Sequence, residues 1–162
     1  MDRVNLVTVG VYGWTLDSFL AALRDADVRL LLDVRQRRGV RGSEYAWANA
    51  KRLESALDES GIGYEHRADL APTTELREVQ YRADDEAGVG KRARSELAPE
   101  YAERYTREIL GRVDLGQLAE GLPKDGAAAL FCVERDPEAC HRSLIAERLE
   151  REFGVSLLHL RP

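Results

Sequence analysis

Residues 127–149 constrain the fold of this chain more than any other stretch. Ala127 to Val133 is a short apolar run without a charge, and the residues from Pro123 to Gly126 before it are typical of a turn. This pattern predicts a strand that is buried on both faces, as in the middle of a parallel sheet. A polar cluster follows, and then an amphipathic helix. In a parallel α/β sheet this junction lies at the carboxyl edge, where ligands bind against helix N-termini.

Four other apolar runs alternate with helical patterns and indicate the rest of the sheet. They cover Val4–Val9, Val28–Val34, Gly63–Arg67 and Val155–Leu160. We therefore predict an α/β fold with a mainly parallel five-stranded sheet and helices on both faces, a Rossmann-like three-layer arrangement. We expect one domain over residues 1–162, with a helical excursion from the sheet at about residues 72–122.

Residues that favour helix N-termini mark where several helices begin. Thr15 and Ser43 are placed to cap helices, and the second of these keeps helical spacing until Gly61. Pro99 suits the first position of a helix, and Asp114 resembles the start of a capping box. These residues predict the connections between the strands.

Composition excludes several classes of protein. A chain of 162 residues with 44% apolar content suits one compact domain. The formal charge of -5 disfavours wholesale non-specific binding of nucleic acid, which depends on Lys and Arg neutralising phosphates. There is no signal-peptide pattern, no apolar run near the ~20 residues of a membrane span, and no disulfide framework. We expect a cytoplasmic protein with no membrane partner, in an oligomeric state that the sequence leaves open.

Two cysteines and a histidine around the strand–helix junction are candidate catalytic residues. The helix begins either with Asp136 as its cap or, after a separate turn, near His141. In both cases Cys140 lies close to the positive end of a helix dipole and beside Arg142, which lowers the pKa of a thiol. Cys140 and Cys132 are then candidate nucleophiles, and His141 is a candidate acid or base. The alternative is that both cysteines are buried core residues.

Cys132 also fits the way in which rhodanese-type sulfurtransferases and Cys-dependent phosphatases present a nucleophile, at a strand end before a loop and a helix. Their loop ends in an Arg-Ser pair, and here Arg142 lies ten residues beyond Cys132, a longer loop than those families use. Glu134 and Asp136 place acids where that loop presents bare amides. An enzyme of this type is therefore an alternative to the leading hypothesis.

Arginines at the end of the Val28–Val34 strand indicate an anionic ligand. Four follow this strand and one follows Cys140: Arg35, Arg37, Arg38, Arg41 and Arg142. A guanidinium binds phosphate bidentately, and a parallel sheet brings these two strand ends to one edge. We expect about two of the five to face a pocket, the others being solvated or paired. We select Arg35, Arg41 and Arg142 as anion-binding candidates.

Supporting candidates lie at the same edge. Carboxylates that could compensate or orient the arginines are Asp33, Glu134 and Asp136. His66 could join the edge from the third strand. Tyr12 could stack on a base, although packing is the commoner role of aromatic residues near this edge, which are Tyr12, Trp14, Tyr45 and Trp47.

Two further clusters give weaker signals. His66 and His141, with a thiol or Asp69, could supply three metal ligands, but the usual ligand spacings are absent, so we predict no metal and no cofactor. A short basic run beside two glycines is typical of a solvated loop and less often clamps a nucleic-acid or nucleotide backbone. We place this run outside the pocket; it consists of Lys91, Arg92 and Arg94.

The motifs together resemble the uncharacterised bacterial and archaeal family called domain of unknown function 488. The resemblance rests on Asp33-Val-Arg35, the arginine-rich loop to Tyr45, Gly61-Ile-Gly-Tyr64, Tyr101 to Tyr105, and Cys132-Val-Glu134 followed by Cys140-His-Arg142. Where the family commonly has Leu-Gly-Gly, this chain has Leu70-Ala71-Pro72, and the usual proline-rich segment is replaced by residues 37–43. The family name implies no activity.

The leading functional hypothesis is an arginine-lined pocket for a phosphate-bearing ligand, either a nucleotide or a nucleic-acid end. An enzyme would use Cys140 or Cys132 as nucleophile, with His141 or His66 as acid or base. A binding module would use the same arginines and leave both thiols inert. A non-catalytic interaction domain would instead pair the arginines with acids and leave no cleft.

Overall fold

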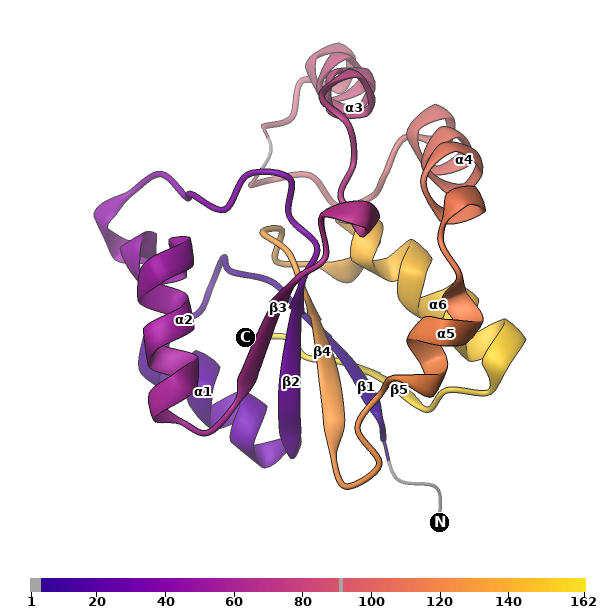
Figure 1. Cartoon of the computed structure of the whole chain (residues 1–162). Helices are drawn as coiled ribbons and strands as arrows, with labels where there is room; N and C mark the ends of the chain where they lie inside the picture. Colours follow the sequence, from indigo (N-terminus) through magenta and orange to yellow (C-terminus); the bar gives the residue numbers. More distant parts are fainter. Residues whose placement is uncertain (1–3, 91) are drawn as a thin grey trace.

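Five parallel strands form the centre of the molecule in the computed structural model, which describes residues 4–90 and 92–162. The strands lie in the order β3-β2-β4-β1-β5 (Figure 1). Their bounds are Leu6–Val9 for β1, Val28–Asp33 for β2, Gly63–His66 for β3, Ala127–Phe131 for β4 and Leu157–His159 for β5. All neighbouring pairs are parallel, which confirms the predicted fold class.

Strand β4 occupies the middle of the sheet, and its carboxyl end is tied to the loop after β1. Every residue of β4 is fully buried, as an uncharged apolar strand allows. The backbone amides of Val11 and Tyr12 donate to the Val133 carbonyl at 2.9 and 3.2 Å. Only glycine fits at Gly10 in this crossing, because a Cβ would lie 1.9 Å from the Glu134 carbonyl oxygen.

Helices cover both faces of the sheet, as predicted (Figure 1). Helices α1 (Leu16–Asp25) and α2 (Ala50–Glu59) pack on one face. Helices α4 (Pro99–Glu108), α5 (Leu115–Glu120) and α6 (His141–Phe153) pack on the other. Helix α3 (Thr74–Ala87) stands beyond the carboxyl ends of the strands in Figure 1. It belongs to the excursion between β3 and β4.

The segment after β2 differs from its prediction. Instead of one helix capped by Ser43, a 3-10 helix, η1 (Ser43–Ala48), is followed by a break and then by α2. Gly42 enters η1 with a φ of 102°, and Asn49 is extended with a ψ of 141°. The side chain of Asn49 accepts from the Val40 amide at 2.8 Å and so fixes the preceding loop instead of capping α2. The helix was predicted from the spacing of apolar residues, and that spacing gives no information about the contact between Asn49 and Val40.

The other helix starts agree with the sequence. Thr15 forms a capping box with Ser18 at the start of α1, and the Asp114 side chain accepts from the Gln117 amide at the start of α5. Pro99 is the first residue of α4. Of the two starts considered for the last helix, the structure has the second, with a separate turn, the 3-10 helix η4 (Pro137–Ala139), before α6 begins at His141. The remaining 3-10 helices are η2 (Ala68–Leu70) and η3 (Leu110–Arg112).

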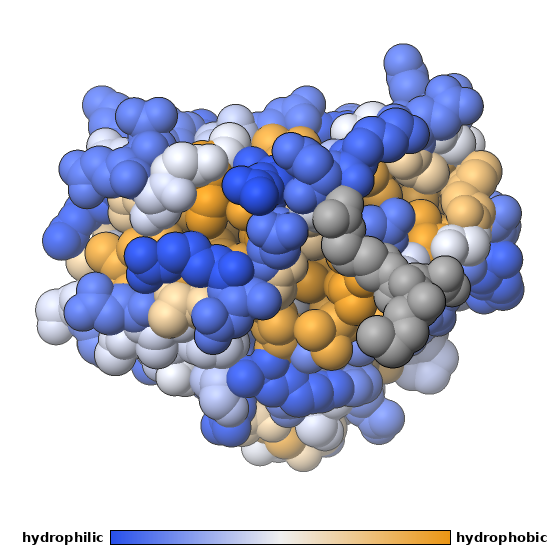
Figure 2. Space-filling model, turned by 90° about the horizontal axis from the view of Figure 1, so that it is seen from below, coloured by the Kyte–Doolittle hydropathy of each residue, from blue (hydrophilic) through white to orange (hydrophobic). Residues whose placement is uncertain are grey.

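The amino-end edge of the sheet is apolar at its centre. Figure 2 views the molecule from this side, and hydrophobic residues lie between hydrophilic ones. None of the helices in the described parts of the chain combines the length and the apolar character that a membrane span requires. The polar cluster predicted from the sequence lies at the opposite, carboxyl edge.

Candidate functional site

A cavity of about 660 Å³ opens at the carboxyl edge of the sheet. Its walls come from the loops that follow β1, β2 and β4, as the parallel topology predicts, and also from α3, α4 and the segment between them. Its floor includes Cys132, Cys140 and His141. The volume falls within the range of about 300–1,000 Å³ that is typical of small-molecule sites.

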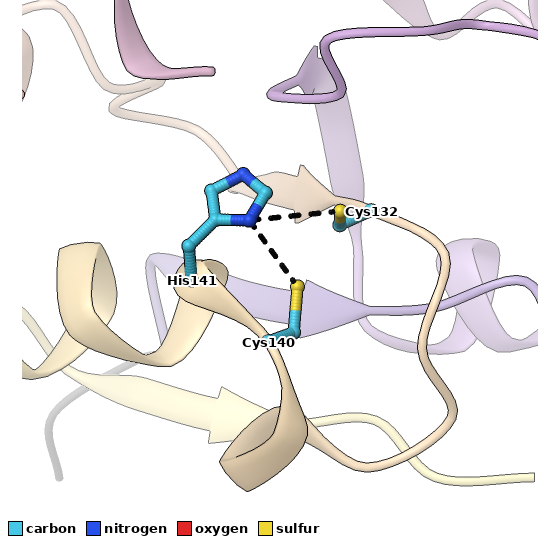
Figure 3. Close-up of side chains that lie close together, drawn as sticks. All are labelled: Cys132, Cys140 and His141. Carbon is cyan, nitrogen blue, oxygen red and sulfur yellow. Dashed lines mark hydrogen bonds between the residues drawn. The ribbon is translucent and has the colours of Figure 1, made fainter. Parts of the chain in front are cut away.

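The two thiols converge on one nitrogen of His141 (Figure 3). Cys132 follows the last residue of β4, Cys140 is the N-cap of α6, and His141 is the first residue of that helix. The Sγ atoms of Cys132 and Cys140 lie 3.9 and 3.7 Å from Nδ1 of His141. All three residues are at most 5% exposed. Local backbone geometry thus gathers a dithiol and an imidazole beneath the cavity.

A backbone contact fixes the tautomer of His141. Its Nε2 lies 2.8 Å from the carbonyl oxygen of Val34, at the end of β2. A carbonyl oxygen only accepts, so Nε2 carries the hydrogen and donates it. In the neutral ring, the lone pair is therefore on Nδ1, which faces the two sulfur atoms.

The environment shifts the pKa values of the three groups in different directions. Burial raises the pKa of the Cys140 thiol, but the hydrogen bond with Cys132 and the charges of His141 and Arg142 outweigh burial and lower it well below its usual value. Burial, together with the hydrogen bond to Cys140, raises the pKa of Cys132. For His141, burial lowers the pKa, and the Cys140 thiolate and the bond to Val34 raise it above its usual value. The pKa of Cys140 is therefore shifted downward, as predicted from the sequence. The reactivity of this thiol stays a prediction.

Three arginines line the cavity without a carboxylate partner among residues 4–90 and 92–162. Arg37 and Arg41 are exposed members of the loop after β2. Arg77, on α3, donates to the Gln36 side chain at 2.9 Å and to the Tyr81 hydroxyl at 2.7 Å. The rim of the cavity therefore carries positive charge that the described part of the protein does not neutralise.

Arg35 also lines the cavity, but its charge is compensated. Its Nε and Nη2 donate to the two carboxylate oxygens of Asp33, each at 2.9 Å, and Nη1 donates to the Ala48 carbonyl. Asp33 also accepts from the Tyr64 hydroxyl at 2.6 Å. Asp33 orients Arg35, as expected, and the buried pair fixes the start of the arginine-rich loop.

The prediction that Arg142 binds the anion is wrong. It is fully buried, does not line the cavity, and donates to the Glu134 and Arg135 carbonyls at 2.7 and 3.2 Å. Its guanidinium holds the loop after β4 and does not face a ligand. Arg38 points elsewhere, toward Glu54 at 3.5 Å. Three of the five arginines therefore line the cavity, one more than expected, and they are Arg35, Arg37 and Arg41.

The basic run was wrongly placed outside the pocket. Arg92 and Arg94 both line the cavity, while Lys91 lies outside the described residues. Arg94 is buried between Asp84 and Glu134, at 2.7 and 2.8 Å. These partners are distant in sequence, so the run by itself could not reveal them.

Arg92 is exposed and reaches the rim beside two aromatic rings. Its guanidinium lies 4.7 Å from the centre of the Tyr12 ring and 5.3 Å from that of Tyr45. It also approaches Glu44 at 3.6 Å. Tyr12 lines the cavity and packs against Tyr45, and its role in base stacking stays a prediction, whereas Trp14 and Trp47 pack against Phe19.

Two supporting candidates lie away from the cavity. His66 does not line it, and its Nε2 lies 3.0 Å from the Arg35 carbonyl. Asp136 approaches Arg161 at 3.5 Å. The described residues do not assemble the metal ligand set considered from sequence, because His66 is not among the residues that gather around His141 and Asp69 pairs with Arg67. Sequence reasoning missed the wall contributed by the excursion, which includes Arg77, Gln80, Tyr81 and Tyr101.

Comparisons with known proteins identify relatives of the chain but no activity. A family model described as "Domain of unknown function DUF488" matches residues 15–149. A crystal structure of a conserved hypothetical protein from Aeropyrum pernix K1 is 23% identical, with a TM-score of 0.41. The match covers 99% of this chain and 39% of that one, so this chain spans well under half of its length. None of the curated proteins compared with the chain matches it.

Proposed function

This chain belongs to the family of domain of unknown function 488, and we propose that it binds a phosphate-bearing ligand of nucleotide size in the cavity at its carboxyl edge. The proposal rests on one observation: Arg37, Arg41 and Arg77 line one cavity without a carboxylate partner in the described parts of the chain. Guanidinium groups bind phosphate oxygens bidentately, which combines charge with geometry.

Electrostatics explains why such a rim recruits an anion. Like charges around a partly enclosed cavity repel one another, and a bound anion removes that repulsion. The carboxylates predicted to compensate the arginines pair with arginines other than Arg37, Arg41 and Arg77. Asp33 binds Arg35, Glu134 binds Arg94, and Asp136 approaches Arg161.

Aromatic residues beside the arginines favour a nucleotide over a small inorganic anion. Tyr12 and Tyr81 line the cavity and are partly exposed, and such rings stack on bases. The volume of about 660 Å³ suits a ligand of this size. The terminal nucleotide of a nucleic acid offers the same phosphate and base.

The cavity weighs against two alternatives. A sulfurtransferase or phosphatase of the Cys-dependent type needs bare donors around an anion at Cys132, and here the buried Glu134 lines the cavity close by in the chain. A purely structural interaction domain needs no cleft with unpaired arginines. Binding of an anion is therefore the function that the geometry supports best.

Thermal unfolding tests this function. Phosphate should raise the melting temperature of the wild type by about 5–10 °C at ~100 times the dissociation constant, compared with chloride at equal ionic strength. Arg41→Ala and Arg77→Ala should each lose most of that shift. Arg52→Ala, an exposed arginine of α2 outside the cavity, is the matched control and should keep it.

The ligand class is resolved by comparing three phosphate compounds in the same assay. A nucleoside monophosphate should stabilise more than inorganic phosphate, because the tyrosines add stacking. A 5′-phosphorylated oligonucleotide that stabilises more strongly still would assign the site to a nucleic-acid end. A melting temperature that does not respond to any phosphate compound would contradict the proposal.

A further inference from the structure

The floor of the cavity contains a cluster that anion binding does not require. Two Sγ atoms and one Nδ1 atom, from Cys132, Cys140 and His141, lie within 4.8 Å of one another. Figure 3 shows the three side chains pointing toward a common centre. We propose that these residues bind a Zn²⁺ ion, with its fourth position open to the cavity. Binding of zinc here does not depend on the proposed function.

The two sulfur–nitrogen distances are close to those of a zinc site. With Zn–S of about 2.3 Å and Zn–N of about 2.0–2.1 Å, tetrahedral geometry places a sulfur and a nitrogen ligand about 3.6 Å apart. The observed Sγ–Nδ1 distances are 3.7 and 3.9 Å. Small side-chain movements would therefore suffice to complete the coordination.

The single Nδ1 atom of His141 favours a metal over hydrogen bonding alone. Nδ1 makes one good hydrogen bond at a time, accepting from a thiol when the ring is neutral or donating to a thiolate when the ring is protonated, yet two sulfur atoms approach it. A metal ion between the three atoms satisfies all of them at once. The bond from Nε2 to the Val34 carbonyl, at 2.8 Å, is the type of outer contact that orients a metal-binding histidine.

Charge and ligand type select the ion. Both cysteines form S–Zn bonds as thiolates and His141 donates its Nδ1 lone pair. The two protons that the thiols and Nδ1 together hold before binding go to the solvent, and no electron is transferred. Two thiolates cancel the charge of Zn²⁺, so no net charge is added beside the buried Arg94 and Arg142. Thiolate and imidazole ligands suit Zn²⁺ and exclude Mg²⁺ and Ca²⁺, which need oxygen ligands.

The number of protein ligands indicates a position for exchange. Among the described residues, three side chains bring a metal-binding atom to this point, and all three line the cavity. Glu134 is held by Arg94 at 2.8 Å. The fourth ligand is then a water molecule or an oxygen of whatever occupies the cavity, as in zinc sites that are open to substrate.

Cobalt substitution tests the site on the reduced protein, with all 162 residues of the chain present. One equivalent of Co²⁺ should bind and give thiolate-to-cobalt charge-transfer absorption, and Zn²⁺ should remove this absorption by displacement. Cys132→Ser, Cys140→Ser and His141→Gln should each weaken binding at least tenfold. His66→Gln is the matched control and should bind as the wild type does, as should Arg41→Ala, which separates this test from that of anion binding.

A second measurement uses only the wild type, so it can be made even if the serine variants do not fold. Zn²⁺ should slow alkylation of both thiols in the wild type at least tenfold, and a chelator should restore the rate. Equal alkylation rates with and without Zn²⁺ would overturn the proposal. So would a cobalt thiolate spectrum of undiminished intensity and affinity in folded Cys132→Ser or Cys140→Ser.

Discussion

Arg142 shows how a single side chain can position a loop without facing a ligand. It lies fully buried at the start of α6, and its donors reach the carbonyls of Glu134 and Arg135. These residues link Cys132 to Cys140. The guanidinium therefore determines the path of the segment that brings the two thiols together.

Truncation of Arg142 should be costly for stability. Arg142→Ala leaves the buried Glu134 carbonyl without this donor and opens a cavity, so the free energy of unfolding should fall by about 3 kcal/mol. Arg148→Ala on the same helix removes only a partly exposed pair with Glu152 and should cost at most ~0.5 kcal/mol. Urea unfolding followed by circular dichroism measures both. Equal stability of the two variants would show that the buried bonds contribute nothing.

Residue type alone could not separate the arginines by role. The sequence correctly placed several of them at one edge, because strand ends in a parallel sheet meet there. It could not show that Arg142 is buried or that Arg94 lies between Asp84 and Glu134, because those environments depend on contacts distant along the chain. For the same reason, the sequence could not show that Cys132 and Cys140 converge on His141.

At the scale of elements, the edge strand β5 is joined to β1 by a side-chain contact as well as by its backbone. Thr8 pairs with His159 in the register of the two strands, and Thr8 Oγ1 hydrogen-bonds with His159 Nδ1 at 2.7 Å. Burial, followed by the charges of Arg142 and Arg161, lowers the pKa of His159. The contact is therefore made by the neutral ring.

This contact predicts a pH dependence of stability. Because the folded-state pKa is below the unfolded value of about 6.5, the unfolded chain binds more protons as the pH falls. The contribution of His159 is complete above that pH and is lost as the pH decreases toward the folded-state pKa. The stability difference between wild type and His159→Gln should therefore shrink from pH 8 to pH 5, measured by urea unfolding with a chelator present. A constant difference would contradict the assigned protonation.

For the whole molecule, periodicity predicted the layers and left the order of the strands open. Alternation of apolar runs with amphipathic helices is sufficient to indicate a parallel sheet with two covered faces. The position of β4 between β1 and β2 depends on how the complete faces pack, which no local pattern encodes. The excursion was located in sequence, but its packing over the carboxyl edge, where α3 contributes Arg77 and Tyr81 to the cavity, was not.

The central claim is that this edge holds an anion site built by segments from across the chain. The most direct test is a crystal structure with tungstate, a phosphate analogue that anomalous diffraction can locate. The strongest anomalous peak should lie inside the cavity, within hydrogen-bonding distance of the guanidinium groups of Arg37, Arg41 or Arg77. Peaks confined to other surfaces, with these arginines in contact only with water, would contradict it.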